Sequence, residues 1–269
     1  MLTVSIVTYK TDLTELEKCF TSLETPIVST IYVVDNSNEN YIKNFCSQYS
    51  NVEYIGKDNI GYGAGHNVGI RKSIQSGADF HLVLNSDVYF RPTDLEKIYS
   101  YMSSNKQVGQ LIPNTIYPNG DMQYVVRLLP TPMIQIFRRF FPDIFFKKYN
   151  DKFLLKDWNH KSPLNIPFHI GCFMFFSNDA LKEIGLFDEK IFMYMEDIDL
   201  TRRMHKKYET IYWPEVTIIH DHKRESYKNT KLLKIHVKSA ITYFNKWGWF
   251  FDRERKVWNK EVLDKIKSM

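Results

Sequence analysis

The chain has 269 residues, of which 43% are hydrophobic and 25% charged, and its formal net charge is +5. This length and composition allow a large α/β core and exclude a disordered chain. The mild positive charge is spread along the chain without a nucleic-acid motif. We therefore expect anionic small molecules or an anionic membrane surface as partners, and no nucleic acid.

The cysteines and the targeting patterns indicate the cellular compartment. Cys19, Cys46 and Cys172 are odd in number and lack metal-ligand spacing, which is typical of buried thiols in a reducing compartment. No leader pattern opens the chain, and no window reaches the ~20 apolar residues of a membrane span. We expect a cytoplasmic protein, soluble or peripheral on the inner face of the plasma membrane.

The first half of the chain alternates strand and helix patterns. Expected strands, rich in β-branched and apolar residues, are 2–9, 30–35, 52–55 and 80–84. Expected helices, with apolar residues on one stripe, are 13–23, 42–49, 64–76 and 93–103. This rhythm predicts an α/β fold with a Rossmann-like, mostly parallel central sheet flanked by helices.

The second half is less regular. Residues 128–167 mix aromatic, proline and basic residues without a clean period, which indicates an insertion over the sheet. Further strands are expected at 169–176, 210–213 and 216–219, and further helices at 178–184, 195–206 and from 230 onward. We expect one domain over residues 1–227, with halves meeting near residue 115, and a helical C-terminal extension over 228–269.

Polar residues follow three of the expected strands. Thr8 and Tyr9 end the first strand, Asp35 and Asn36 end the second, and residues 85–87 follow the fourth. Each is ordinary alone, but ligands of open α/β sheets bind at the carboxyl ends of the strands. Asp35 at such an edge could accept a hydrogen bond from a ribose hydroxyl or a base N–H.

A metal site is a second hypothesis at this edge. Asp87, the last residue of Asn85-Ser86-Asp87, is a hard oxygen ligand suited to Mg²⁺ or Mn²⁺. His220 and His222 follow the strand 216–219, and an imidazole ligand would shift the preference towards Mn²⁺. A purely structural role for either histidine stays open.

Residues 59–65, Asn-Ile-Gly-Tyr-Gly-Ala-Gly, place three glycines before a helix. Backbone without Cβ can approach a ligand closely, and a helix N-terminus favours phosphate. The alternative is a tight strand-to-helix turn. The motif does not follow the first strand and lacks the G-x-G-x-x-G spacing, which disfavours a dinucleotide-binding Rossmann enzyme.

Three carboxylates open the expected helix 195–206: Glu196, Asp197 and Asp199. Acidic residues in a first turn complement the helix N-terminus, which is an ordinary surface arrangement. The apolar run 191–195 before them could instead place one carboxyl in a partly dry cleft, as a general base requires. The cluster alone leaves both hypotheses open.

Taken in order, these motifs carry a resemblance to a known family. The chain resembles a family 2 glycosyltransferase with the GT-A fold, and within it the rhamnosyltransferase-like branch. The resemblance covers residues 1 to about 227. The segments that carry it are 4–9, 33–37, 59–69, 84–87, 171–175, 185–188 and 196–200.

The resemblance implies an activity and a division of the chain. The activity is inverting transfer of a sugar from a nucleotide diphosphate sugar, dTDP-rhamnose or a UDP-sugar. The acceptor is a hydroxyl of a glycan or lipid-linked saccharide in cell-surface polysaccharide synthesis. Residues 1–115 would bind the nucleotide sugar, and residues 116–227 would form the acceptor half.

The resemblance also implies roles for individual residues. Asp197 would be the general base with Glu196 as its neighbour, and Asp199 would be helix-end charge only. Asp87 would bind a divalent metal, Mn²⁺ or Mg²⁺. Asn85 replaces the first Asp of the family's metal motif, which leaves weaker or less selective metal binding open. The implied nucleotide-sugar-binding residues are Thr8, Tyr9, Asp35, Asn36, Asn59, Gly61, Asn67, Asn85 and Ser86. The family's closing His-plus-Ser pattern matches His220 or His222, followed by Ser226.

Two segments, 137–148 and 243–256, mix aromatic with basic residues. Such segments suit a membrane interface, where aromatic rings enter the headgroup boundary and Lys or Arg meets anionic lipid. The alternative is that the aromatic rings pack on the domain while the charges stay in water. Trp247 and Trp249 are the residues whose replacement would distinguish the two. A homodimer is also left open.

Two other functions are weighed against glycosyl transfer. A nucleotidyltransferase would need a glycine-rich basic loop after the first strand, and residues 8–12 contain no glycine. A non-catalytic sugar- or membrane-binding module would not need Asp35, Asp87 and Asp197 together. Both alternatives are therefore disfavoured.

Overall fold

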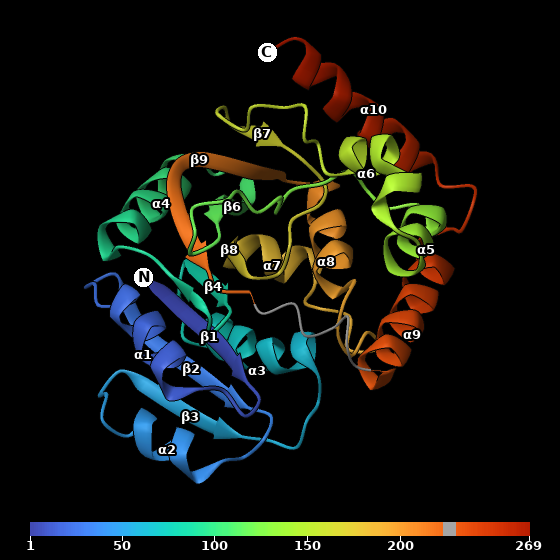
Figure 1. Cartoon of the computed structure of the whole chain (residues 1–269). Helices are drawn as coiled ribbons and strands as arrows, with labels where there is room; N and C mark the ends of the chain where they lie inside the picture. The colour runs from blue at the N-terminus through green and yellow to red at the C-terminus, as the bar shows by residue number, and fades with distance from the viewer. Residues whose placement is uncertain (223–229) are drawn as a thin grey trace.

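The computed structural model describes residues 1–222 and 230–269, without the side chains of residues 139, 140 and 143. A central sheet is covered by helices, and the C-terminal helices lie beside the 132–153 segment at one end of the molecule (Figure 1). The strands are β1 (Leu2–Thr8), β2 (Val28–Asp35), β3 (Val52–Gly56), β4 (Phe80–Leu84), β5 (Val88–Tyr89), β6 (Val108–Ile116), β7 (Leu164–Asn165), β8 (Phe173–Ser177) and β9 (Glu209–His220). The helices are α1 (Leu13–Ser22), α2 (Asn40–Cys46), α3 (Tyr62–Gln75), α4 (Pro92–Ser104), α5 (Pro132–Phe140), the 3₁₀ turn η1 (Asp143–Phe145), α6 (Lys147–Phe153), α7 (Asn178–Ile184), α8 (Glu196–His205), α9 (Thr230–Trp247) and α10 (Arg253–Lys267).

The strands form one sheet in the order β3-β2-β1-β4-β8-β6-β9-β5, with β7 paired to β9. β1 is parallel to β2 and β4, β2 is parallel to β3, and β6 is parallel to β9. This architecture confirms the expected α/β class. β8 runs antiparallel between β4 and β6, so its beginning meets the carboxyl end of β4. The Asn85 N–H accordingly donates to the Cys172 carbonyl at 2.9 Å.

The second half differs from expectation at β6, at β9 and at the two-residue β7, which the sequence did not predict. The sequence did not predict β6, which contains Gln110, Pro113 and Asn114. The two strands expected around Pro214 are one strand, β9, whose pairing with β6 skips residues 214–216. Proline has no N–H to donate to a ladder, so a local irregularity accommodates it without ending the strand.

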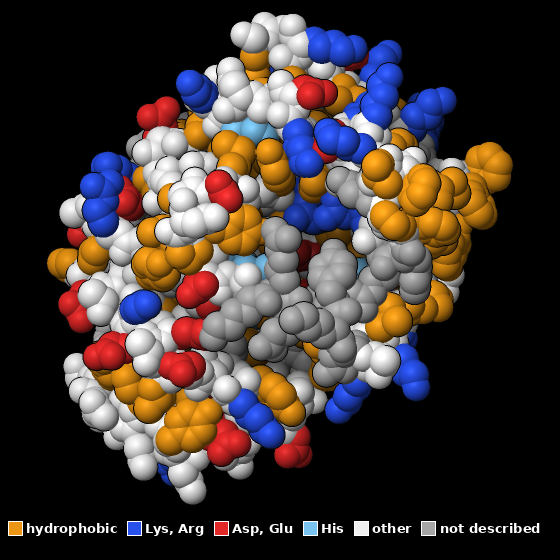
Figure 2. Space-filling model, in the orientation of Figure 1, with side chains coloured by type: hydrophobic (Ala, Val, Ile, Leu, Met, Phe, Trp, Pro, Cys, Tyr) orange, Lys and Arg blue, Asp and Glu red, His pale blue; other side chains and the backbone are white. Residues whose placement is uncertain are grey.

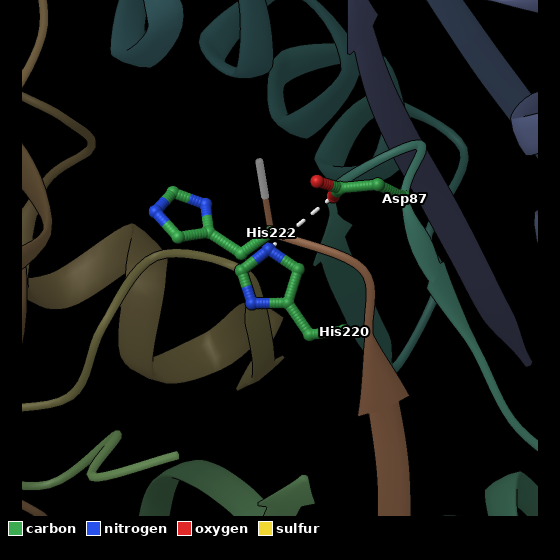
Figure 3. Close-up of side chains that lie close together, drawn as sticks. All are labelled: Asp87, His220 and His222. Atoms are coloured by element: carbon green, nitrogen blue, oxygen red, sulfur yellow. Dashed lines mark ion pairs between the residues drawn. The ribbon is translucent and has the colours of Figure 1, made fainter. Parts of the chain in front are cut away.

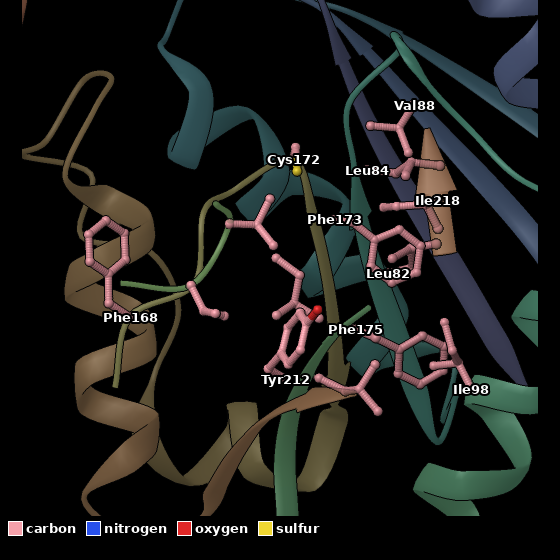
Figure 4. Close-up of a cluster of buried hydrophobic side chains, with 14 of the residues drawn as sticks. Leu82, Leu84, Val88, Ile98, Phe168, Cys172, Phe173, Phe175, Tyr212 and Ile218 are labelled. Carbon is pink, nitrogen blue, oxygen red and sulfur yellow. The ribbon is translucent and has the colours of Figure 1, made fainter. Parts of the chain in front are cut away.

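The core fills both faces of the sheet. Along β8, Phe173 and Phe175 belong to a cluster that includes Leu82 and Ile98 (Figure 4). Met174 and Phe176 belong to a second cluster with residues of α3, α7 and α8. All four β8 side chains are fully buried, because side chains alternate across a strand that is covered on both faces. The three cysteines are free and buried, as expected.

Buried charges and amides join the C-terminal helices to the rest of the chain. The Arg202 guanidinium of α8 donates to both Asp252 oxygens, at 2.7 and 2.6 Å, and both side chains are buried. The Asn259 amide of α10 exchanges two hydrogen bonds with the Leu129 backbone. The division into domains stays a prediction, and its boundary at 227–228 falls outside the described residues. Within the described part of the chain, no helix is long and apolar enough to span a bilayer.

Candidate active site

The carboxyl ends of β1 and β2 are tied together by Asp35. Its Oδ1 accepts from the Thr8 hydroxyl at 3.1 Å and from the Ser37 N–H and hydroxyl at 3.0 and 2.7 Å. Its Oδ2 accepts from the Glu39 N–H at 2.6 Å and the Tyr54 hydroxyl at 3.1 Å. Burial alone would raise the pKa of Asp35, but these hydrogen bonds outweigh it and hold the pKa below its ordinary value.

Asp35 therefore acts within the protein as the organiser of the two turns. Five protein donors occupy the lone pairs of its two oxygens, so a direct bond to a ribose or base would require one donor to leave. Asn36 lies beside it, buried, and donates to the Gly61 carbonyl at 3.0 Å. Its Oδ1 has no hydrogen-bond partner in the described structure.

Gly61 joins this edge to the loop that precedes α8. Its φ is +94°, and a Cβ there would lie 2.3 Å from the Phe192 carbonyl oxygen. The next N–H, that of Tyr62, donates to the same carbonyl at 2.9 Å. The Asn59 side chain accepts from the Gly61 N–H and shapes the turn. The glycine serves a tight turn against Phe192, which is the alternative that the sequence left open.

Asp87, His220 and His222 form a cluster between the ends of β4 and β9 (Figure 3). Their ligand atoms lie within 4.8 Å of one another, and the two imidazole centroids are 5.1 Å apart. Ligands on opposite sides of one small divalent ion are about 4.2 Å apart, so a small rotation of these side chains suffices to meet on an ion.

Gln123 fixes the orientation of His220. Its amide N–H₂ donates to the His220 carbonyl at 2.6 Å, and its oxygen accepts from the His220 Nδ1 at 2.9 Å. This arrangement makes Nε2, which faces Asp87, the ring nitrogen that could bind a metal in place of a proton. Nε2 is buried without a hydrogen bond among the described residues, and Asp87 Oδ1 lies 3.3 Å away.

The electrostatic surroundings of His220 also favour a cation. Burial alone would lower the pKa of His220, but the Cys172 sulfur and the Asp87 carboxyl outweigh it and raise the pKa to about 10. A negative field of this kind stabilises a divalent ion as well as a proton. The donor set therefore fits Mn²⁺ or Mg²⁺ at Asp87 with imidazole support.

Tyr62, the first residue of α3, connects this cluster to the acidic pair of α8. Its hydroxyl lies 2.9 Å from Asn85 Oδ1 and 2.5 Å from the Gly171 carbonyl oxygen. The Gly171 N–H in turn donates to Asp197 Oδ2 at 2.9 Å. Burial raises the pKa of Tyr62, and its acidic neighbours Glu196, Cys172, Asp197 and Asp87 raise it further. The tyrosine therefore lies between Asp87 and the acidic pair of Glu196 and Asp197.

Asp197 is a partly exposed carboxyl with a shifted pKa. Its Oδ1 accepts from the Ile198 N–H at 2.8 Å. Burial raises its pKa to about 6, although the two backbone N–H donors and the charge of Arg127 act in the opposite direction. Burial and the neighbouring Asp197 raise the pKa of Glu196 well above its ordinary value, and Glu196 Oε2 has no partner in the described structure.

The backbone before this pair adopts an uncommon conformation. Tyr194 and Met195 have φ values of 68° and 70°, in the left-handed region that non-glycine residues seldom occupy. Met195 caps α8 without a side-chain hydrogen bond. Strain of this kind persists where surrounding contacts fix it, and here it turns the chain so that α8 begins at the acidic pair.

Several expected site residues lie elsewhere or have other contacts. Asn67 is buried, and its amide bonds the Phe187 backbone and the Glu189 carboxylate, so it holds loop 187–189. Asp199 is more than helix-end charge: fully buried, it accepts from the Trp247 indole at 2.8 Å and from Lys246. Tyr9 and His222 are exposed, and Ser86 is partly exposed. Ser226 lies outside the described residues.

Four site residues were missed from the sequence: Tyr62, Gln123, Arg127 and Gly171. Tyr62 and Gly171 stand inside motifs that were recognised, but nothing local shows that they meet. Gln123 and Arg127 lie in an irregular stretch between β6 and α5, and only the fold brings them to β9 and α8. A surface depression of about 680 Å³ lies on α4 beside Trp213, and none of the expected site residues lines it.

The fold and the placement of the acidic groups define an α/β protein of the GT-A glycosyltransferase class. The structure of GalNAc-T7 with UDP, GalNAc and Mn²⁺ aligns with all of this chain and 51% of its own, with TM-score 0.64 and 14% identity. The mannosyltransferase PcManGT from Pyrobaculum calidifontis, with GDP-Man and Mn²⁺, aligns with 90% of this chain and 64% of its own, with TM-score 0.56 and 15% identity. At these identities the likeness shows the fold.

The sequence comparisons show the family. A family model described as glycosyl transferase family 2 matches residues 3–185, and the chain belongs to that family. The hexosyltransferase Agl10 of low-salt glycan biosynthesis in Haloferax volcanii is 28% identical over 211 residues, which are 77% of this chain and 62% of Agl10. The chain thus spans less than two thirds of that relative.

Two further relatives have rhamnosyltransferase names, in agreement with the branch that the motifs resemble. Rhamnosyltransferase WbbL of Escherichia coli is 24% identical over 89% of this chain and 88% of its own length. The N-acetylglucosaminyl-diphospho-decaprenol L-rhamnosyltransferase of Mycobacterium tuberculosis is 26% identical over 84% of this chain and 77% of its own length.

Proposed function

We propose that the protein is an inverting glycosyltransferase of cell-surface polysaccharide synthesis, with Asp197 as its general base. The donor is a nucleotide diphosphate sugar, dTDP-rhamnose or a UDP-sugar, and the acceptor is a hydroxyl of a glycan or lipid-linked saccharide. The observation that carries the proposal is the carboxyl of Asp197, partly exposed and linked through Gly171 and Tyr62 to the strand end that bears Asp87. The names of the relatives support this donor and acceptor chemistry.

Asp197 has the properties that this reaction asks of a base. Inverting transfer is a single displacement, in which the base removes the proton of the acceptor hydroxyl as its oxygen attacks the anomeric carbon. A carboxyl with a pKa of about 6 is largely ionised at neutral pH, yet more basic than an ordinary aspartate. The N–H groups of Gly171 and Ile198 bond one oxygen each and fix the direction of the carboxylate.

Asp87 would hold a divalent metal, with His220 and His222 as further ligands and Gln123 orienting His220. Bound there, the cation supplies stabilisation of the negative charge that develops on the departing diphosphate. Asn85 does not add a charge to this set, and its Oδ1 is within hydrogen-bond distance of the Tyr62 hydroxyl. Asp35 and Asn36 would shape the pocket for the nucleoside by holding the turns after β1 and β2.

Thermal shift with a panel of nucleotides tests whether the protein binds the nucleotide part of the proposed donor. It distinguishes a glycosyltransferase from a binding module without a nucleotide site. The wild-type protein is expected to gain about 5 °C with UDP or dTDP at ~100 times Kd, and only with Mn²⁺ present. Asp87→Ala should lose this gain while its unliganded melting temperature stays close to that of the wild type. No stabilisation by UDP, dTDP or GDP would contradict nucleotide-sugar binding.

The proposed location is the cytoplasm, with contact at the inner face of the plasma membrane. A lipid-linked acceptor would require such contact, and the decaprenol acceptor in the name of the mycobacterial relative supports this chemistry.

A further inference from the structure

Exposed apolar side chains gather on one side of the molecule. Among the described residues, twelve of the eighteen large hydrophobic side chains that are exposed belong to residues 133–149 and 237–257. The four most exposed are Phe251 at 98%, Ile144 at 80%, Phe145 at 79% and Phe250 at 77%; elsewhere in the described chain no such side chain exceeds 55%. Figure 2 shows this hydrophobic surface on the side formed by α5, α9 and the turn before α10.

The two segments are distant in sequence but fixed to each other. The Arg255 guanidinium donates to the Pro130 carbonyl, and the Asn259 amide bonds the Leu129 backbone on both its donor and acceptor sides. These contacts hold α10 against the chain that enters α5. The turns that carry Ile144–Phe145 and Phe250–Phe251 are therefore parts of one surface, which we call the aromatic face.

Positive charge is concentrated in the same elements. Residues 132–153 and 230–269 contain fifteen of the 36 Lys and Arg residues but six of the 31 Asp and Glu residues. The remainder of the chain has 21 basic and 25 acidic residues and is net negative. The net charge of +5 thus arises from the elements that build the aromatic face, with exposed Lys147, Lys148, Arg253 and Lys256 beside its most exposed side chains.

We infer that the aromatic face binds an anionic lipid surface. Protruding Phe and Ile side chains on turns can enter the headgroup boundary, while the surrounding Lys and Arg meet negative headgroups. A second copy of the chain fits this face less well, because two such faces would bring their positive charges together. The most exposed of these side chains protrude from turns, so the contact lies at the bilayer surface.

The aromatic face adjoins the loop that leads into the acidic pair. On α9, the Ser239 hydroxyl donates to the Met193 carbonyl at 2.7 Å, and the His236 ring lies 5.0 Å from that of Tyr194. A membrane bound at this face would thus lie near the side of the site at which Asp197 receives the acceptor. This statement about orientation rests on the proposed function, whereas the lipid contact itself does not.

The sequence pointed to Trp247 and Trp249 as the residues to replace in a test of membrane contact, and the structure favours other residues. Trp247 is partly buried, and it packs on α8: its ring lies 4.1 Å from the Arg202 guanidinium and its indole donates to Asp199. Replacing it would disturb the docking of α9. Phe250 and Phe251 have no such role, so Phe250→Ser/Phe251→Ser and Ile144→Ser/Phe145→Ser remove apolar side chains without emptying the core.

Flotation with lipid vesicles tests the inference on the full chain. The wild type should float with vesicles of phosphatidylcholine mixed with phosphatidylglycerol, and not with phosphatidylcholine alone. Each double Ser variant should lower partitioning at least about tenfold, and so should Lys148→Glu/Lys256→Glu. Leu13→Ser, which removes an exposed apolar side chain on α1, is the matched control and should bind as the wild type does.

Three outcomes would overturn the inference. The first is a wild type that stays unbound with anionic vesicles, and the second is a double Ser variant with unchanged partitioning. The third is a dimer in light scattering that Phe250→Ser/Phe251→Ser dissociates, which would show that a second copy covers the face. The nucleotide thermal shift of each variant is read in parallel, so that loss of lipid binding is distinguished from failure of the proposed function.

Discussion

Glu196 and Asp197 are adjacent carboxyls with different surroundings. Asp197 is partly exposed and receives two backbone N–H bonds, while Glu196 is buried with one oxygen that lacks a partner in the described structure. Both pKa values are raised, that of Asp197 to about 6 and that of Glu196 well above its ordinary value. Environments that separate two carboxyls in this way suit one to act as a base and keep the other protonated.

The pH dependence of turnover follows from this difference. A base acts in its ionised form, so kcat/KM should rise with pH through about 6 and level off above pH 7. Glu196→Gln resembles the protonated glutamic acid, so the variant should keep kcat/KM within about threefold of the wild type. The acid limb of its pH profile should not shift to higher pH. The measurement is donor turnover against pH for both proteins. An acid limb near pH 4, or a hundredfold loss in Glu196→Gln, would contradict these roles.

At the scale of elements, the turn into α3 controls the position of the loop before α8. Gly61 has a positive φ and touches the Phe192 carbonyl, whereas Gly77, at the end of α3, has a φ of +74° and open space around its Cβ position. Comparing substitutions at the two glycines therefore separates the cost of a left-handed backbone from the cost of a steric contact.

The pair Gly61→Ala and Gly77→Ala measures that separation. Gly77→Ala should lower the free energy of unfolding by about 1 kcal/mol, because only the left-handed conformation is disfavoured. Gly61→Ala should lower it by about 2–4 kcal/mol, since the added Cβ also displaces the Phe192 backbone. Urea unfolding of both variants decides the point, and equal losses would show that the Phe192 contact is not restrictive.

The C-terminal helices hold α8 through contacts to two buried charges on α8, those of Arg202 and Asp199. Arg202 lies between Asp252, Glu254 and the Trp247 ring, and Asp199 receives Lys246 and the Trp247 indole. The helix that begins at the acidic pair is therefore fixed along its length by α9 and the start of α10. A buried charge is costly when its partner is removed, more than the intact pair contributes.

Asp252→Ala should accordingly lower the free energy of unfolding by about 3–5 kcal/mol, because it leaves the Arg202 guanidinium buried without its main partner. Glu254→Ala is the matched control, since Glu254 also bonds Arg202 but is 38% exposed, and its loss should cost about 1 kcal/mol or less. Chemical denaturation compares the two variants. Similar losses of unfolding free energy in the two variants would mean that the buried Arg202–Asp252 pair does not hold the C-terminal helices against α8.

At the scale of the whole molecule, local pattern predicted the first half of the fold well. Apart from the two-residue β5, the strands and helices up to α4 follow from runs of apolar residues and helical stripes, which depend on neighbours in the chain. β6 was missed because Gln110 and Pro113 interrupt its pattern, and its partner β9 lies about a hundred residues further on. Such a strand is defined by its pairing more than by its own sequence.

The candidate site likewise contains some residues that could be recognised from the sequence and others that only the fold brings together. Asp35 and Asp87 were singled out because carboxylates at strand ends can be recognised locally, whereas the choice of Asp197 from its acidic cluster came from the resemblance to the family. Asn67 was expected to bind the nucleotide sugar, yet its amide is bound to loop 187–189, a contact that depends on how α3 meets a distant segment. Gln123 and Tyr62 were missed for the same reason. The catalytic and binding roles stay proposals.

Comparison of the wild type with Asp197→Asn tests the central claim most directly. With Mn²⁺ and a panel of dTDP- and UDP-sugars, the variant should bind nucleotide with a Kd within about threefold of the wild type, because the proposed role puts Asp197 on the acceptor side. Its donor turnover should fall at least about a hundredfold, since the amide cannot take the proton of the attacking hydroxyl. Turnover close to that of the wild type, with nucleotide binding intact, would contradict the assignment of Asp197 as the base.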